Sequence, residues 1–176
     1  MRVLHLASFD RWTGAAAPAW AEVEALRAAG VEAHYGYIGG NNLEKRIGGS
    51  DFAHAVLRKG HMPAAMIHSI RALRALLERE RFEIVHAHLS HDHWLSSLAI
   101  RRNNVPLVRT FHARRALRRD PLTSRLFAAT DGICVVNEEF VWHPALRGRD
   151  ALWTAPPLDP RQFSPAGADA RALHGI

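Results

Sequence analysis

The chain has 176 residues, of which 48% are hydrophobic and 23% charged, a composition typical of one soluble globular domain. Its net charge of +6 leaves phosphate-bearing substrates, anionic membranes and nucleic acid open as partners. Cys134 is the only cysteine, which excludes an internal disulfide. The apolar start is too short for a signal peptide and no stretch is long enough for a membrane span, so we expect a cytoplasmic protein.

Short apolar runs alternate with helical patterns along the chain. In order, we expect a strand at 2–8, a helix at 18–29, a strand at 31–38, a glycine-rich loop at 39–50, a helix at 63–81, a strand at 82–87, a helix at 92–102, a strand at 106–111, a helix near 122–129, a strand at 132–136, a helix near 138–147 and a strand at 151–155. This alternation predicts an α/β fold of the doubly wound class, with a parallel sheet covered on both faces.

The helix at 63–81 has the strongest amphipathic pattern. Its arginines lie opposite an apolar face that we expect to be buried and that consists of Met66, Ile67, Ile70, Leu73, Leu76 and Leu77.

Ligands of doubly wound sheets gather at the carboxyl ends of the strands, which here are followed by unusual loops. The sequence HAHLSHDH spans residues 86–93, directly after one such strand. Histidines at this spacing are found in zinc sites, so His86, His88 and His91 could activate a water for hydrolysis. The same stretch could line a sugar-binding pocket, or Asp92 could cap the helix that follows.

Six arginines are concentrated from Arg109, within the strand at 106–111, to Arg125. A phosphate-bearing acceptor, an anionic membrane or solvent alone could face this cluster. Because almost no aromatic residues are interleaved with these arginines and no nucleic-acid motif appears, we do not expect binding to nucleic acid.

Several blocks occur in a fixed order along nearly the whole chain: RVLHLAS followed by a loop with glycine, FEIVHAHLSHDHWLSSLAIRRNNVPLVRTFH, TDGICVVNEEF and APPLDPRQFSP. In order and spacing they resemble the amino-terminal half of a family 4 glycosyltransferase with the GT-B fold. Two blocks depart from the family pattern. The first turn keeps one glycine, Gly14, and the last block keeps Pro157, Asp159, Phe163 and Pro165 but has PL in place of an asparagine-glycine pair.

The resemblance implies roles for individual residues. Gly14 would let backbone amides approach the donor phosphate at a helix amino terminus, or would merely form a tight turn. His112 would face the transferred sugar and act in catalysis, or would be a loop histidine bonded to backbone. Residues expected to contact the acceptor are Trp12, His88, His91, Asp92, Arg114 and Arg115. Family 4 enzymes of this fold need no metal and no cofactor, since the nucleotide sugar is a substrate.

The resemblance predicts one Rossmann-like domain at 1–165 and, at 166–176, the start of a linker to a carboxyl-terminal donor-binding domain. It implies the acceptor-binding half of a retaining glycosyltransferase, inactive without that domain, acting on a glycan, a lipid-linked acceptor or a small molecule. A weak contact with an anionic membrane at its cytoplasmic face is a further expectation. Two alternatives are a non-catalytic module that binds a glycan or lipid-linked acceptor, and the zinc-dependent hydrolase described above.

Overall fold

The computed structural model describes residues 1–60, 62–102 and 104–158. These residues form one sheet of seven parallel strands in the order β3-β2-β1-β4-β5-β6-β7. The strands are β1 (Arg2–Leu6), β2 (Glu32–Ile38), β3 (Ala53–Leu57), β4 (Ile84–Ala87), β5 (Leu107–Phe111), β6 (Gly132–Val135) and β7 (Ala151–Trp153). The α-helices are α1 (Ala16–Ala28), α2 (Glu44–Ile47), α3 (Pro63–Glu80), α4 (Ser90–Ala99) and α5 (Pro121–Ala128).

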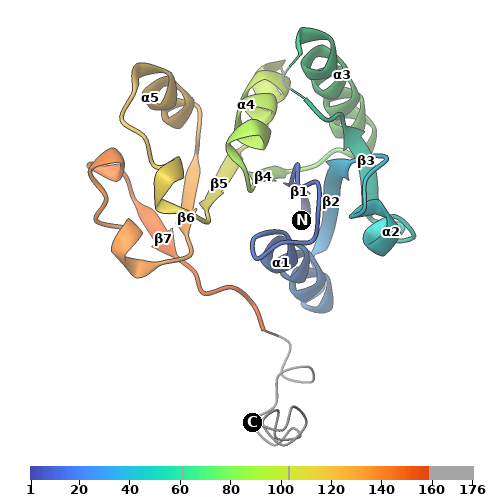
Figure 1. The fold of residues 1–176 in the computed structure, drawn as a ribbon, viewed down its shortest axis with the longest axis horizontal. Coiled ribbons are helices and arrows are strands. Elements are labelled where there is room, and N and C mark those ends of the chain that lie inside the picture. The colour runs from blue at the N-terminus through green and yellow to red at the C-terminus, as the bar shows by residue number, and fades with distance from the viewer. Residues whose placement is uncertain (61, 103, 159–176) are drawn as a thin grey trace, which may run out of the picture.

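Helices cover both faces of the sheet, which confirms the predicted Rossmann-like, doubly wound class. Figure 1 shows α3, α4 and α5 on one side of the strands and α1 on the other. From β1 the chain adds strands toward one edge of the sheet, β2 and then β3, and from β4 onward it adds them toward the other edge. The boundary between β1 and β4 is therefore the topological switch point, where ligands of such sheets bind. The carboxyl ends of β1 and β4 are therefore the place to look for a site.

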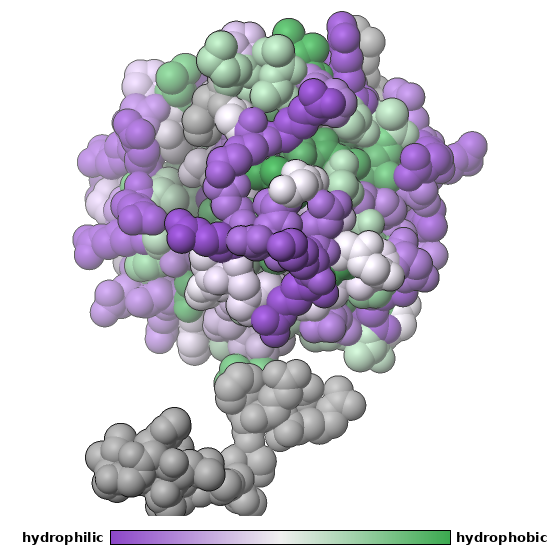
Figure 2. Space-filling view, turned by 45° about the vertical axis from the view of Figure 1, so that its right-hand side comes forward, coloured by the Kyte–Doolittle hydropathy of each residue, from purple (hydrophilic) through white to green (hydrophobic). Residues whose placement is uncertain are grey.

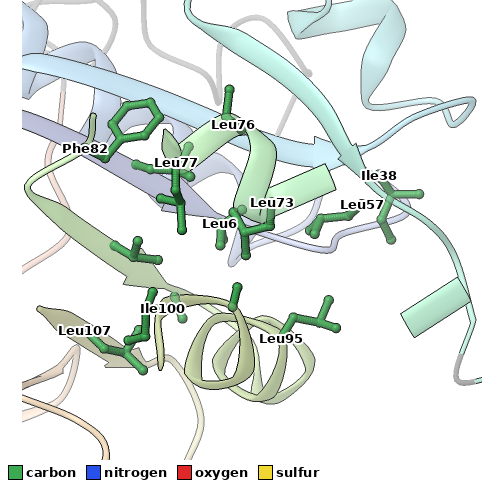
Figure 3. Close-up of a cluster of buried hydrophobic side chains, with 14 residues drawn as sticks. Leu6, Ile38, Leu57, Leu73, Leu76, Leu77, Phe82, Leu95, Ile100 and Leu107 are labelled. Carbon is green, nitrogen blue, oxygen red and sulfur yellow. The ribbon is translucent and has the colours of Figure 1, made fainter. Parts of the chain in front are cut away.

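The main apolar core lies between the sheet and the pair α3 and α4 (Figure 3). Leu73, Leu76 and Leu77 of α3 and Leu95 of α4 are buried there against Leu6 of β1 and its neighbours. Successive side chains of a strand point to opposite faces. Because Leu4 and Leu6 face this core, His5 between them points to the side of α1.

One residue of the predicted apolar face of α3 is not buried. Ile67 is 49% exposed, whereas Leu73 is fully buried and Met66 and Ile70 are partly buried against the core. The buried stripe follows the spacing 66, 70, 73 and 77, so Ile67 lies at its edge, on the side that also carries Arg71 and Arg74. The prediction that Ile67 is buried was wrong.

Two segments have regular structure that the sequence pattern did not indicate. β3 pairs with β2 from Tyr35↔Ala53 to Ile38↔Leu57. Because β3 is an edge strand and only partly buried, its sequence lacks the continuous apolar run of the central strands. In the glycine-rich loop, α2 makes one turn, with the Glu44 carboxylate accepting a hydrogen bond from the Gly40 amide at 2.6 Å.

The helix expected near 138–147 is instead two 3-10 turns, Glu138–Phe140 and Pro144–Leu146. The side chains of Asn137 and His143 each accept a hydrogen bond from a backbone amide of the turn that follows. Pro144 has no amide hydrogen to continue the first turn into a helix. Two further 3-10 turns, Ile100–Arg102 and Arg114–Ala116, follow α4 and β5.

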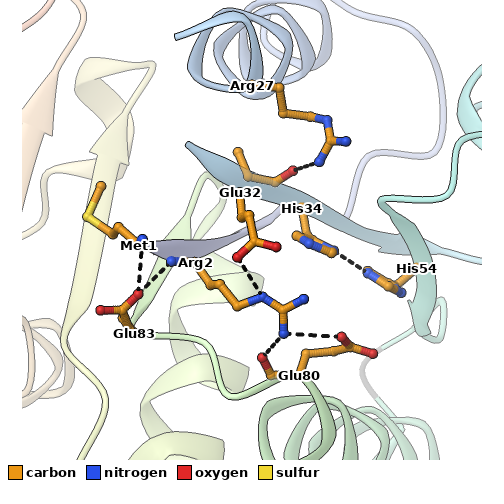
Figure 4. A network of polar contacts seen from close by, with 9 residues as sticks. Met1, Arg2, Arg27, Glu32, His34, His54, Glu80 and Glu83 are labelled. Carbon is orange, nitrogen blue, oxygen red and sulfur yellow. Dashed lines mark hydrogen bonds and ion pairs between the residues drawn. The ribbon is translucent and has the colours of Figure 1, made fainter. Parts of the chain in front are cut away.

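A polar network holds the amino-terminal end of the sheet together, away from the switch-point loops (Figure 4). The Arg2 guanidinium lies 3.1 Å from a Glu32 carboxylate oxygen and 3.5 Å from one of Glu80. The Glu83 carboxylate accepts a hydrogen bond from the Arg2 amide at 2.7 Å. These contacts tie β1 to β2, to the end of α3 and to the segment that leads into β4.

Hydrophilic side chains dominate the face of the molecule shown in Figure 2, with smaller apolar areas between them. Among the residues that the structure describes, no helix combines the length and apolar character needed to span a bilayer.

Candidate functional site

Three histidines meet on the α1 side of the sheet at its switch point. His5 of β1 pairs in register with His86 of β4, and His88 lies just beyond the end of β4. The ring centroids are 4.7 Å apart for His5 and His86, 5.3 Å for His5 and His88, and 4.5 Å for His86 and His88. All three side chains are buried. We call His5, His86 and His88 the histidine cluster.

A chain of hydrogen bonds leads from the cluster to the next strand. The Nδ1 atom of His5 lies 3.0 Å from Nε2 of His88, and Nδ1 of His88 lies 3.1 Å from Nε2 of His112. His112 directly follows β5 and is only partly buried. The buried imidazoles of His5 and His88 are thus linked by hydrogen bonds to His112, which solvent can reach.

Helix α1 adds a carboxylate to the histidine cluster. Glu22 lies on α1, and one of its oxygens is 3.5 Å from Nδ1 of His86. The other ring nitrogen of His86, Nε2, is 2.6 Å from the hydroxyl of Thr110 on β5. Both nitrogens of His86 therefore have a polar neighbour, one from the helix and one from the sheet.

A pocket of about 250 Å³ opens next to this arrangement, between α1 and the carboxyl ends of β5, β6 and β7. Its polar lining includes Glu22, Thr110, His112 and Thr154, and its apolar lining includes Pro18 and Val136. Parallel strands β5 and β6 bring their ends to the same edge, which explains why residues so distant in sequence share one pocket.

Burial keeps the imidazoles of the site neutral. It lowers the pKa of His5 to about 3 and the pKa values of His86 and His88 well below the usual range. The pKa of His112 falls to about 4, first through burial and then through the positive charge of Arg109. Burial also raises the pKa of Glu22 to about 7. At neutral pH, His112 can therefore offer a hydrogen bond but no positive charge.

Asp92 and Arg109 are fully or almost fully buried beside the site. The Asp92 carboxylate accepts hydrogen bonds from the amides of Ser8 at 3.0 Å and Leu89 at 2.9 Å, which fixes the loop after β1 to the start of α4. Burial raises the pKa of Asp92 to about 6, while these bonds and Arg109 oppose the rise. Asp92 thus has the helix-capping role that its position in the sequence suggested.

The sequence places Arg109 in a cluster with the arginines that follow it, and the prediction that this cluster faces solvent or a ligand is wrong for Arg109. It is instead 2% exposed, and its guanidinium lies 3.3 Å from the Ala87 carbonyl and 4.8 Å from the centre of the Phe111 ring. Since it occupies an inward position of a central strand, β5, it cannot contribute to a surface cluster.

The other predicted acceptor residues are not members of the histidine cluster. Trp12 is exposed at 37%, and the guanidinium of Arg46 lies 4.2 Å from the centre of its ring. His91 lies in the first turn of α4, and Arg114 and Arg115 are exposed in the 3-10 turn after His112. None of these four predicted residues is among those lining the described pocket. Their contact with an acceptor stays a prediction.

Gly14 lies in the exposed turn before α1, and a Cβ atom there would meet nothing within 4 Å. The turn itself therefore does not require glycine, and donor-phosphate binding at Gly14 stays a prediction. So does the acceptor contact of His88 and Asp92, whose side chains are fully buried and bonded to protein groups. Asp159, Phe163, Pro165 and the expected linker at 166–176 lie outside the described residues.

The sequence patterns did not indicate His5 and Glu22 as site residues, nor the pocket residues Thr110 and Thr154. A histidine in the middle of the apolar run RVLHLAS was the available signal for His5, because an ionisable residue buried in a central strand needs a partner. Glu22 had a weaker signal, since it lies at helical spacing from Pro18 and Ala25, two other residues that line the pocket.

Solved structures share this fold over almost the whole chain. A glycosyltransferase from Rickettsia africae superimposes with a TM-score of 0.73 at 14% identity, covering 99% of this chain and 48% of its own. Sucrose-phosphate synthase from Thermosynechococcus elongatus gives 0.73 at 16%, covering 99% and 52%. HepE from Anabaena, solved in complex with UDP-glucose, gives 0.71 at 12%, covering 99% and 49%. The chain therefore spans about half of the length of each of these proteins.

No curated protein is significantly similar to the chain in sequence. A match to the family described as Glycosyltransferase Family 4 covers residues 12–142, which are most of the chain. This range includes the described site except His5 and the pocket residues after β7. The fold corresponds to one half of the GT-B architecture of the structural neighbours, as the sequence blocks predicted. The chain belongs to glycosyltransferase family 4.

Proposed function

We propose that this chain is the acceptor-binding half of a retaining glycosyltransferase, which moves a sugar from a nucleotide-sugar donor to a glycan, a lipid-linked acceptor or a small molecule. The observation that carries the proposal is the position of His112. It lies at the carboxyl end of β5 and lines the pocket together with Glu22 and Thr110. Its Nε2 atom is within hydrogen-bond distance of buried His88. The pocket is thus a concave site with a few fixed polar groups, as small-molecule sites usually are.

The proposed reaction breaks the bond between the anomeric carbon and the donor phosphate and forms a bond from that carbon to the acceptor oxygen on the same face. The proton of the acceptor hydroxyl goes to the departing phosphate. His112, which is neutral, positions a hydroxyl of the transferred sugar through a hydrogen bond and stabilises the oxocarbenium-like state as charge develops. Gly14, just before the start of α1, is proposed to let backbone amides at the amino terminus of that helix approach the donor phosphate.

The donor-binding half is proposed to be a second domain, because the chain spans about half of its structural neighbours. The 176-residue chain alone is then expected to be inactive. The exposed pair Arg114 and Arg115 is proposed to attract an acceptor phosphate or an anionic membrane surface at the cytoplasmic face.

The test has two steps. The open reading frame downstream of Ile176 is sequenced, and its full product is assayed for release of nucleoside diphosphate from a panel of nucleotide sugars. Turnover that falls at least a hundredfold in His112→Ala, but not in the control His68→Ala on the exposed side of α3, supports the proposal. A reading frame that stops at Ile176, with no turnover, would overturn it and favour a non-catalytic module that binds an acceptor.

A further inference from the structure

We propose that His5, Glu22, His86 and His88 form a binding site for one divalent transition-metal ion, with Zn²⁺ as the best candidate. One ligand atom from each of these residues lies within 4.8 Å of the others, which makes them the candidate metal group among the described residues. Three imidazole nitrogens and one carboxylate oxygen are a ligand set that Zn²⁺ takes in proteins. The ion would sit between the sheet and α1, at the switch point.

The distances suit a tetrahedral ion. Ligand atoms bound at the usual Zn–N and Zn–O lengths are about 3.3 Å from one another. His5 Nδ1 and His88 Nε2 are 3.0 Å apart, and His86 Nδ1 and Glu22 Oε1 are 3.5 Å apart. Two pairs are thus already near the required separation. The other ligand atoms, which lie up to 4.8 Å apart, would have to move closer by up to about 1.5 Å to reach that geometry.

The second nitrogen of two of these imidazoles already has a suitable partner. A histidine that binds metal through one nitrogen usually donates the N–H of the other to a protein acceptor, which fixes its orientation. If His88 binds through Nε2, its Nδ1–H points at Nε2 of His112, 3.1 Å away. If His86 binds through Nδ1, its Nε2–H points at the hydroxyl of Thr110, 2.6 Å away.

The histidine cluster is not satisfied by the protein alone. The Nε2 atom of His5 is buried and has no hydrogen-bond partner among the described residues. When His5 donates Nδ1–H to His88, its Nε2 carries a bare lone pair, and when His5 accepts at Nδ1, its Nε2 carries an N–H without an acceptor among the described residues. The unpaired atom is Nε2, whereas the distances above bring the ion to Nδ1, so it marks a cluster that the protein leaves incomplete and is not itself the ligand atom.

Charge and access also decide whether an ion can bind. The guanidinium of Arg109 is near enough to affect the pKa values of His86 and His88 and opposes a second cation. Asp92 balances that charge, and Glu22 supplies one negative charge to the ion itself. Glu22 lines the pocket and is partly exposed, so an ion entering from solvent meets the carboxylate first and then the buried imidazoles.

This site differs from the zinc site suggested by the sequence, which used His86, His88 and His91. His91 is not a member of the candidate group, and His5 and Glu22 take its place. The inference also departs from the expectation, implied by the family resemblance, that no metal is needed. It does not rest on the proposed function, and no step of sugar transfer passes through the ion.

The test uses the 176-residue chain, freed of metal with a chelator and titrated with Zn²⁺ by calorimetry and with Co²⁺ by visible absorption. We expect one ion per chain, with the intense visible bands of four-coordinate Co²⁺. Glu22→Gln should weaken Zn²⁺ binding at least about tenfold, and His86→Gln should abolish it. His93→Gln removes an equally buried histidine from α4, bonded to Thr130 outside the cluster, and should leave binding unchanged.

Absence of saturable Zn²⁺ and Co²⁺ binding to the wild-type chain would overturn the proposal. So would wild-type affinity in Glu22→Gln, a conservative change at a partly exposed helix position that should leave the fold intact. If His86→Gln does not fold, as judged by circular dichroism, Glu22→Gln and the Co²⁺ spectrum of the wild type still decide the question. No donor or acceptor is present, so either result leaves the glycosyltransferase proposal to its own test.

Discussion

Nδ1 of His88 lies 3.1 Å from Nε2 of His112, so a fully buried residue after β4 holds a partly exposed residue after β5 in place. A neutral imidazole has one donor and one acceptor nitrogen, and this contact therefore fixes which nitrogen of His112 remains for a ligand. His88 touches the pocket only through His112 and is best described as a positioning residue.

Replacing His88 should impair turnover more than substrate binding. In the proposed two-domain enzyme, His88→Gln is expected to lower kcat by roughly tenfold to a hundredfold, because His112 loses its fixed orientation. KM for the nucleotide sugar should change little. Steady-state kinetics against several donor concentrations checks this, with His68→Gln on the exposed side of α3 as the control. A change in KM alone would contradict a positioning role.

Removal of the Asp92 carboxylate should destabilise the fold. Asp92→Ala leaves the amides of Ser8 and Leu89 without their acceptor in a buried place, which should cost about 1–3 kcal/mol. Urea unfolding followed by circular dichroism measures the loss. Asp120→Ala removes the cap of α5, where water can replace the carboxylate, and should have a smaller effect. Equal losses in the two variants would contradict the buried role of Asp92.

Stability should fall as the pH falls, and His93 should account for a measurable share. Burial lowers the pKa of His93 to about 3, whereas in the unfolded chain it is about 6.5. Between about pH 6.5 and about pH 3, His93 is protonated in the unfolded chain but not in the folded one. The contribution of neutral, buried His93 to the free energy of unfolding is therefore fully present above about pH 6.5 and decreases as the pH falls below it.

From pH 7.5 to 5.5, His93 should contribute a loss of about 1 kcal/mol. His93→Gln keeps a polar side chain beside Thr130 but does not titrate, so its stability should depend less on pH than that of the wild type. Urea unfolding at the two pH values measures the difference. The same slope in both proteins would show that folding does not lower the pKa of His93.

Two substitutions on α3 should differ in how much they lower the free energy of unfolding, because one is in the buried stripe and the other at its edge. Leu73→Ala opens a cavity in the main core and should cost about 2–5 kcal/mol. Ile67→Ala removes a side chain that is 49% exposed and should cost about 0.5 kcal/mol or less. Thermal and urea unfolding of the two variants checks the contrast. A large loss in Ile67→Ala would indicate that this side chain is covered in solution.

The sequence indicated the sheet better than the site. Strands such as β1 and β4 are apolar because both of their faces are buried, and α3 has a clear helical period, so local patterns predict them. β3 was not predicted, because an edge strand is only partly buried and its sequence lacks a continuous apolar run. The depth of Arg109 was also missed, since burial depends on what packs over β5 and not on the arginines near it in sequence.

The site itself depends on contacts between distant parts of the chain. The local pattern HAHLSHDH drew attention to His86 and His88, which lie together in the histidine cluster, but suggested His91 as their partner. The residues that meet them, His5 and Glu22, come from the first strand and the first helix. Only the pairing of β1 with β4 brings His5 to His86, and a single sequence does not reveal this pairing directly.

That pairing also has a consequence for how the chain folds during synthesis. β1 is central in the sheet, but its second neighbour is β4, and Val3 pairs with Ile84. When the ribosome has made only β1, α1 and β2, one side of β1 still has unpaired backbone groups, which are open to wrong strand pairing. Such distant parallel contacts also form slowly, because a long loop must close first. The backbone groups on this side of β1 therefore stay unpaired until residues 84–87 have been made and β4 can pair with β1.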